Sequence, residues 1–116
     1  YGVFHDFDRT RAFNIFNRSC SAESGRALCE IGFPYFFSPS PTDINAEDIK
    51  CPTLIIGAGR DRITPVQISK KLKKKLGERS ELIIFKKFSH YIMEGEEFST
   101  IFQYIVKWIK KNRNNP

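Results

Sequence analysis

Two short apolar runs stand out in the second half of the chain, and each gives way to a polar loop. The first covers residues 51–57 and the second covers residues 81–86. Runs of this length, apolar at nearly every position, are typical of strands buried on both faces of a parallel sheet. The pattern therefore predicts two such strands. Pro52 is tolerated because it lies among the first residues of its strand.

Helical periodicity follows each run. Thr64 is predicted to cap a helix with Pro65 at its first position and Gln67 completing a capping box, and Gly77 is predicted to end that helix. From about residue 96 to residue 111, apolar side chains recur at helical spacing, so we expect a second helix with this stripe in the core. The stripe consists of Phe98, Ile101, Phe102, Ile105, Trp108 and Ile109.

The first part of the chain has a different pattern. Residues 1–37 are rich in Phe and predict irregular helices. One of them is predicted over residues 22–31, with Ser21 as its N-cap and Glu23 in its first turn. The sequence Ser-Pro-Ser-Pro at residues 38–41 cannot continue a helix, so it predicts a linker.

The order of these elements indicates the fold class. Residues 42–111 run strand, loop, helix, strand, loop, helix, which predicts an α/β fold with a parallel sheet between helices. Two parallel strands make an unstable sheet by themselves, so we expect the sheet to be incomplete in this chain. The predicted organisation is a helical segment with its linker over residues 1–41, followed by the α/β part over residues 42–116.

Composition excludes several classes of protein. The 116 residues suffice for one domain, and no apolar stretch reaches the roughly 18 residues of a membrane span. The three cysteines form no CxxC pair, which argues against a disulfide framework or a metal site. We therefore expect reduced, partly buried thiols at Cys20, Cys29 and Cys51 in a cytoplasmic protein. The chain begins with Tyr1 rather than methionine, so we expect it to be part of a longer protein.

Positive charge is concentrated in the second half of the chain. The formal net charge is +6, and most of the basic excess lies in residues 60–116. Such an excess attracts polyanions without indicating a nucleic-acid function. The densest cluster, the lysines within residues 70–75, is expected to be the solvated face of its helix. Ile68, Leu72 and Leu76 would then face inward.

Two ionisable residues are placed where α/β proteins carry their active sites. Asp61 lies in the loop after the first predicted strand, and His90 lies in the loop after the second. The carboxyl ends of parallel strands meet at one edge of the sheet, so both loops should emerge there. An acid followed by a histidine is also the order found in the Ser-Asp-His triads of α/β-hydrolases. In such a triad the carboxylate orients the imidazole, and the imidazole takes the proton of the nucleophile.

Several segments resemble the C-terminal portion of an α/β-hydrolase of the carboxylesterase and lipase-like type. They are residues 49–57, residues 59–65, the stretch SHYIMEGEEF that contains His90, and the cap-like residues 23–28. The resemblance implies the last two parallel strands with their flanking helices, preceded by a helical cap segment. It also implies hydrolysis of an ester or related acyl bond through an acyl-enzyme, with a small-molecule substrate and neither metal nor organic cofactor. Asp61 would orient His90, and His90 would act as general base and then as general acid.

The chain departs from that family at the nucleophile. The G-x-S-x-G segment is absent, and Ser24 is interpreted as a mid-helix residue without a preceding strand. The serine is therefore expected outside this chain, and an aspartate in place of the serine stays open as the nucleophile.

Two alternative functions remain, a noncatalytic remnant of a truncated or split hydrolase gene and a basic nucleic-acid-binding domain. The expected partners are the missing N-terminal half or a second copy, paired through the open sheet edge. His5 is expected at the surface, while Tyr91 and Ile92 either line an acyl pocket or pack.

Overall fold

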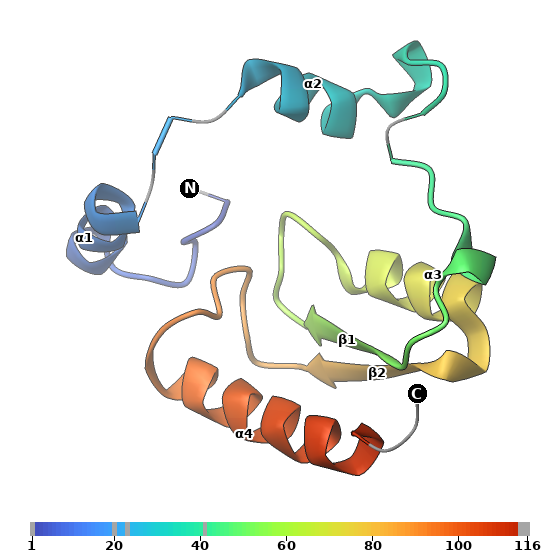
Figure 1. The fold of residues 1–116 in the computed structure, drawn as a ribbon. Coiled ribbons are helices and arrows are strands. Elements are labelled where there is room, and N and C mark those ends of the chain that lie inside the picture. The colour runs from blue at the N-terminus through green and yellow to red at the C-terminus, as the bar shows by residue number, and fades with distance from the viewer. Residues whose placement is uncertain (1, 20, 23, 41, 114–116) are drawn as a thin grey trace. The chain divides into compact units, whose positions relative to one another are not determined.

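The computed structural model describes residues 2–19, 21–22, 24–40 and 42–113 (Figure 1). The chain divides into two compact units, one spanning Asp8–Asn45 and the other combining residues 2–7 with the residues from Ala46 onward. The sequence analysis predicted one helical segment with its linker over residues 1–41. Residues 2–7 lie with the second unit because their aromatic rings pack there, with the ring of Phe4 5.2 Å from the ring of Tyr91.

The first unit contains the helices α1, Arg9–Ser19, and α2, Gly25–Gly32. The predicted N-cap at Ser21 is wrong, because α2 begins after Ser24 and the Ser24 side chain accepts a hydrogen bond from Ala27 N at 3.4 Å. A capping oxygen satisfies an N–H two or three residues further along, so Ser24 determines where this helix begins. Ser24 is thus a cap and not the mid-helix residue that the sequence indicated. Glu23, whose place in the first turn was predicted, lies outside the described residues.

The second unit contains the predicted parallel sheet. Strand β1, Thr53–Ala58, pairs with β2, Ser80–Phe85, in a parallel register from Thr53 opposite Ser80 to Ala58 opposite Phe85. Helix α3, Val66–Leu76, connects the strands, and helix α4, Gly95–Asn112, follows β2 (Figure 1). The described chain is therefore a mixed α/β structure with four α-helices and a two-stranded parallel sheet, as the alternation of elements predicted. Both strands lie within two residues of their predicted ends.

The two helices cover opposite faces of this sheet. A Cβ placed on Gly57 would lie 3.2 Å from Ser69 Oγ, so the face of β1 that contains Gly57 packs against α3. Tyr104 of α4 contacts the other face, where its hydroxyl donates to Glu81 Oε1 at 2.7 Å and its ring lies 6.2 Å from that of Phe85. Alternate residues of a strand point to opposite faces, which places α3 and α4 on opposite sides. The Tyr104 hydrogen bond lowers the pKa of Glu81.

The apolar stripe of α4 is only partly buried, which corrects the prediction that it belongs to the core. Ile101 is 3% exposed, but Phe102 and Ile109 are 52% and 50% exposed. Ile68 of α3, predicted to face inward, is 53% exposed. A sheet of two strands covers only the part of each helix that lies directly over it. The rest of each apolar face therefore stays accessible within the described chain.

Gly77 ends α3 in a backbone conformation that other residues rarely adopt. Its φ is 67° and its ψ is −148°, a region that is populated almost exclusively by glycine. The carbonyl groups of Gly77 and Ser80 both accept hydrogen bonds from Lys73 Nζ at 2.7 Å. This lysine therefore fixes the connection from α3 to β2 and does not belong to a purely solvated face. The turn leads directly into β2.

We expect Gly77→Ala to lower the free energy of unfolding of this unit by about 1–3 kcal/mol, because a Cβ makes this conformation strained. Urea unfolding followed by the fluorescence of Trp108 on α4 measures the change. Glu78→Ala, at the neighbouring exposed position, is the control and should stay within about 0.5 kcal/mol of the parent chain. Equal midpoints for Gly77→Ala and the parent would contradict the turn geometry.

Candidate active site

Two loops leave the same edge of the sheet and carry the predicted residues. Asp61 follows β1, and His90 follows β2. The loops remain paired beyond the ends of the strands, since Arg60 N donates to Phe88 O at 2.9 Å. This backbone pairing positions the residue after Arg60 beside the segment that leads to His90.

Gly59 allows the two loops to approach this closely. Its N–H donates to Phe85 O at 2.9 Å. A Cβ built on Gly59 would lie 2.5 Å from Lys86 O and 2.6 Å from Lys86 Cα. These are backbone atoms, which cannot swing aside as the end of a flexible side chain can. The close approach therefore requires a residue without a side chain at position 59.

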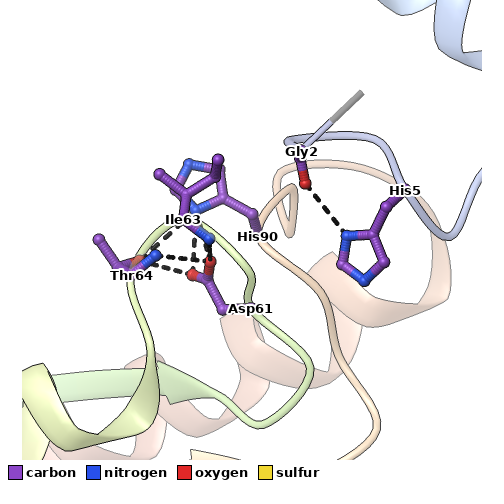
Figure 2. A network of polar contacts seen from close by, with 6 residues as sticks. All are labelled: Gly2, His5, Asp61, Ile63, Thr64 and His90. Atoms are coloured by element: carbon purple, nitrogen blue, oxygen red, sulfur yellow. Dashed lines mark hydrogen bonds and ion pairs between the residues drawn. The ribbon is translucent and has the colours of Figure 1, made fainter.

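The structure brings Asp61 and His90 together, as the sequence predicted. His90 Nδ1 lies 2.9 Å from Asp61 Oδ2 and 3.1 Å from Asp61 Oδ1 (Figure 2). The Asp61 side chain is 6% exposed, whereas the His90 side chain is 32% exposed. Nδ1 faces the carboxylate, so the other ring nitrogen, Nε2, points away from Asp61 (Figure 2). The pair thus combines a shielded carboxylate with an imidazole that is about a third exposed.

Hydrogen bonds keep this shielded carboxylate ionised. Oδ1 accepts from the backbone N–H groups of Ile63 at 2.7 Å and Thr64 at 2.8 Å, and Oδ2 accepts from the Thr64 hydroxyl at 2.6 Å. Burial alone would raise the pKa of Asp61, but the bonds from Thr64, His90 and Ile63 together lower it to about 2. An ionised carboxylate can only accept, so His90 Nδ1 must carry the proton that it shares with Asp61.

The lowered pKa of Asp61 makes the free energy of unfolding of this unit depend on pH at low pH. Because the pKa is lower in the folded chain than its ordinary value of 3.8, the stabilisation is complete above about pH 4 and is lost as the pH falls toward about 2. The loss attributable to Asp61 is about 2 kcal/mol. Urea midpoints measured from pH 5 to pH 2 should fall less steeply for Asp61→Asn than for the parent chain. Parallel curves for the two proteins would contradict this account.

Thr64 contributes differently from the prediction. The sequence indicated a capping box for α3, but the N-cap of α3 is Pro65 and its side chain makes no capping hydrogen bond. The Thr64 hydroxyl donates instead to Asp61, and its oxygen lies 3.5 Å from His90 Nδ1. Sequence reasoning missed this role because a threonine before proline gives the same local signal in both cases.

A second polar cluster beside the site was also missed. His5, expected at the surface, has a side chain only 7% exposed, with Nδ1 3.1 Å from Gly2 O (Figure 2) and Nε2 3.4 Å from Asp6 Oδ1. Asp6 Oδ1 also pairs with the Arg60 guanidinium at 2.6 Å. These contacts hold residues 2–7 against the loop that carries Asp61.

An aromatic group joins the same N-terminal residues to the loop that carries His90. The rings of Phe4 and Phe7 lie 5.2 Å and 6.1 Å from the ring of Tyr91, the residue after His90. Tyr91 therefore packs, which was one of its two predicted roles. No local pattern in the sequence predicts contacts between segments that are so far apart.

The described part of the chain offers little for a metal or a disulfide. No group of three or more His, Cys, Asp or Glu side chains suited to a metal occurs among these residues. Cys29 and Cys51 are free and exposed, so the prediction that they are partly buried is wrong, and Cys20 lies outside the described residues. No helix within residues 2–113, their undescribed positions aside, is long and apolar enough to cross a membrane.

Family models, curated proteins and solved structures give no match to this chain. Ser24 caps α2, and none of the described residues before it forms a strand, whereas a nucleophile elbow requires a strand before its serine.

Proposed function

We propose that this chain supplies the acid and the histidine of a Ser-Asp-His triad in an α/β-hydrolase that acts on ester or related acyl bonds. The observation that supports this most strongly is the Asp61–His90 pair, whose Nδ1 and Oδ2 atoms are 2.9 Å apart. The two residues lie at the carboxyl ends of adjacent parallel strands, the edge where α/β enzymes place their catalytic groups. The serine comes from a segment outside these residues. That segment would complete the sheet along its open edge.

Each group has a defined task in this reaction. As the serine oxygen attacks the acyl carbon, its proton moves to His90 Nε2, and the bond to the leaving alcohol breaks after His90 returns that proton to the alcohol oxygen. Water then attacks the acyl-enzyme and gives a proton to Nε2. The bond between the acyl carbon and the serine oxygen breaks as His90 returns that proton to the serine oxygen, which releases the acid product and regenerates the serine. Asp61 stays ionised throughout and stabilises the imidazolium from the side of Nδ1. Its pKa of about 2 suits this role, because the proton then remains on the histidine.

The test compares the product of the longest reading frame that encodes these residues with its His90→Ala variant. The parent should hydrolyse a p-nitrophenyl ester and react covalently with a fluorophosphonate probe. The variant should lose activity by a factor of about 10³ or more. Glu78→Ala, an exposed change on the same unit, serves as the control and should leave the rate unchanged. The 116-residue chain alone should show no turnover above buffer, because it lacks the nucleophile.

Other outcomes would favour the rival functions. Absence of a nucleophile elbow from the reading frame, together with an inactive product, would indicate a noncatalytic remnant. Activity that survives His90→Ala would contradict the proposed triad. A salt-dependent shift in the electrophoretic mobility of DNA by the chain would favour nucleic-acid binding through α3. The exposed basic residues of this helix are Lys70, Lys71, Lys74 and Lys75.

A further inference from the structure

Thr64 contacts both oxygens of the Asp61 carboxylate. Its backbone N–H donates to Oδ1 at 2.8 Å, and its hydroxyl donates to Oδ2 at 2.6 Å. The N–H of Ile63 is a second donor to Oδ1, at 2.7 Å. A carboxylate offers about four lone-pair positions, so these three donors leave about one for His90. The imidazole therefore meets a carboxylate whose other acceptor positions are already occupied.

The position of Thr64 in the sequence predicts a different role for its hydroxyl, as the cap of a helix. A threonine directly before a proline at the first helical position typically caps that helix, and the sequence Thr64-Pro65-Val66-Gln67 fits this capping-box pattern. In the structure α3 begins without a side-chain cap, and the hydroxyl is directed to Asp61. The Thr64 hydroxyl therefore bonds to the carboxylate that faces His90 and not to the backbone of α3.

We infer that Thr64 is a positioning residue, whose hydroxyl fixes the Asp61 carboxylate so that a single acceptor position faces His90 Nδ1. The inference extends the proposed function, since it concerns how the histidine of that triad is oriented. Without the hydroxyl, Oδ2 has one unfilled acceptor position in a site where the Asp61 side chain is 6% exposed. His90 then has more than one way to bond to the carboxylate, and water competes for the same oxygen.

Two substitutions separate the hydroxyl from the shape of the side chain. Thr64→Val keeps the branched shape and removes the donor, whereas Thr64→Ser keeps the donor and removes a methyl group. Thr53→Val is the matched control, because the hydroxyl of Thr53 bonds to Cys51 O at the opposite end of β1. All three are made in the 116-residue chain, and circular dichroism verifies that each variant folds.

Two NMR measurements report on the carboxylate and on the imidazole. The carboxyl ¹³C signal of Asp61 follows its titration, and the Nδ1 proton of His90 reports on its hydrogen bond through its shift and its exchange with water. In Thr64→Val we expect the pKa of Asp61 to rise by about one pH unit and the Nδ1 proton to exchange at least several times faster. Thr64→Ser and Thr53→Val should resemble the parent chain in both measurements.

The outcomes are distinct. Unchanged Asp61 titration and Nδ1 exchange in Thr64→Val would overturn the inference, and a lower unfolding midpoint with both signals unchanged would show a merely structural role. In the product of the full reading frame, Thr64→Val should lower kcat about tenfold, with recovery in Thr64→Ser. If that product is inactive while both NMR signals respond to Thr64→Val, the positioning of Asp61 stands and the proposed function fails.

Discussion

Asp61→Asn is expected to move the proton of neutral His90 from Nδ1 to Nε2. In the parent chain Oδ2 accepts from both the Thr64 hydroxyl and His90 Nδ1, at 2.6 Å and 2.9 Å. An asparagine amide has one oxygen and one NH₂ group, so only one of the two carboxylate positions can still accept. The tautomer of His90 then depends on which position the amide oxygen takes.

The backbone decides the orientation of that amide. Oδ1 accepts from the N–H groups of Ile63 and Thr64, which are fixed by the turn and cannot reverse their direction. The asparagine oxygen must therefore occupy the place of Oδ1, and its NH₂ group replaces Oδ2. The NH₂ group donates toward His90 Nδ1, which can accept only when it carries no proton. The proton consequently resides on Nε2, where it prevents His90 from accepting a proton from a nucleophile.

Long-range ¹H–¹⁵N correlation spectra of the 116-residue chain, recorded where the imidazole is neutral, distinguish the two tautomers. His5 is an internal control, because its Nδ1 lies 3.1 Å from Gly2 O and not beside Asp61. Its signals should be the same in both proteins. A His90 that keeps its proton on Nδ1 in Asp61→Asn would refute the assigned bonding.

The same substitution should affect catalysis strongly if the proposed function holds. A histidine in the wrong tautomer cannot act as a general base, and a comparable change in a Ser-His-Asp triad costs about 10⁴ in kcat. We therefore expect Asp61→Asn in the product of the full reading frame to lose activity by about that factor. Glu78→Ala again serves as the exposed control.

The parts of the site that could be predicted are those encoded by order along the chain. Each apolar run ends at a loop, and parallel pairing then brings Asp61 and His90 to one edge of the sheet without knowledge of any side-chain contact. The same reasoning predicted the turn at Gly77 and the parallel sheet, because glycine and strand patterns act locally.

The parts that could not be predicted depend on contacts between distant segments or on a choice between equivalent local bonds. The pairing of Asp6 with Arg60 joins residues that are 54 positions apart, and the neighbouring His5, expected at the surface, has a side chain only 7% exposed. Thr64 illustrates the second case, since a threonine before a proline can cap a helix or, as here, donate to a nearby carboxylate. The exposed rings of α4, such as Phe102 at 52%, show a third limit. Periodicity identifies an apolar face but does not show how much of it the rest of the chain covers.

Gly59→Ala is expected to have the largest effect on the stability of the second unit. The added Cβ would meet the O, Cα and C atoms of Lys86 at 2.5, 2.6 and 2.8 Å, so the two loops would have to separate. Their separation weakens the bonds from Gly59 N to Phe85 O and from Arg60 N to Phe88 O. Steric overlap and lost hydrogen bonds together should cost about 3 kcal/mol.

Gly57→Ala provides the matched control, two residues earlier in the chain. Its Cβ would meet Ser69 Oγ at 3.2 Å and otherwise ordinary side-chain contacts, which can shift by the small distance required. Urea unfolding followed by Trp108 fluorescence should therefore show a much smaller loss than for Gly59→Ala. The Nδ1 proton of His90 should exchange rapidly in Gly59→Ala and slowly in Gly57→Ala, because only the first substitution displaces the loop that holds Asp61. Equal losses of stability in the two variants, with an unchanged His90 signal, would mean that the approach of the two loops at Gly59 does not position the pair.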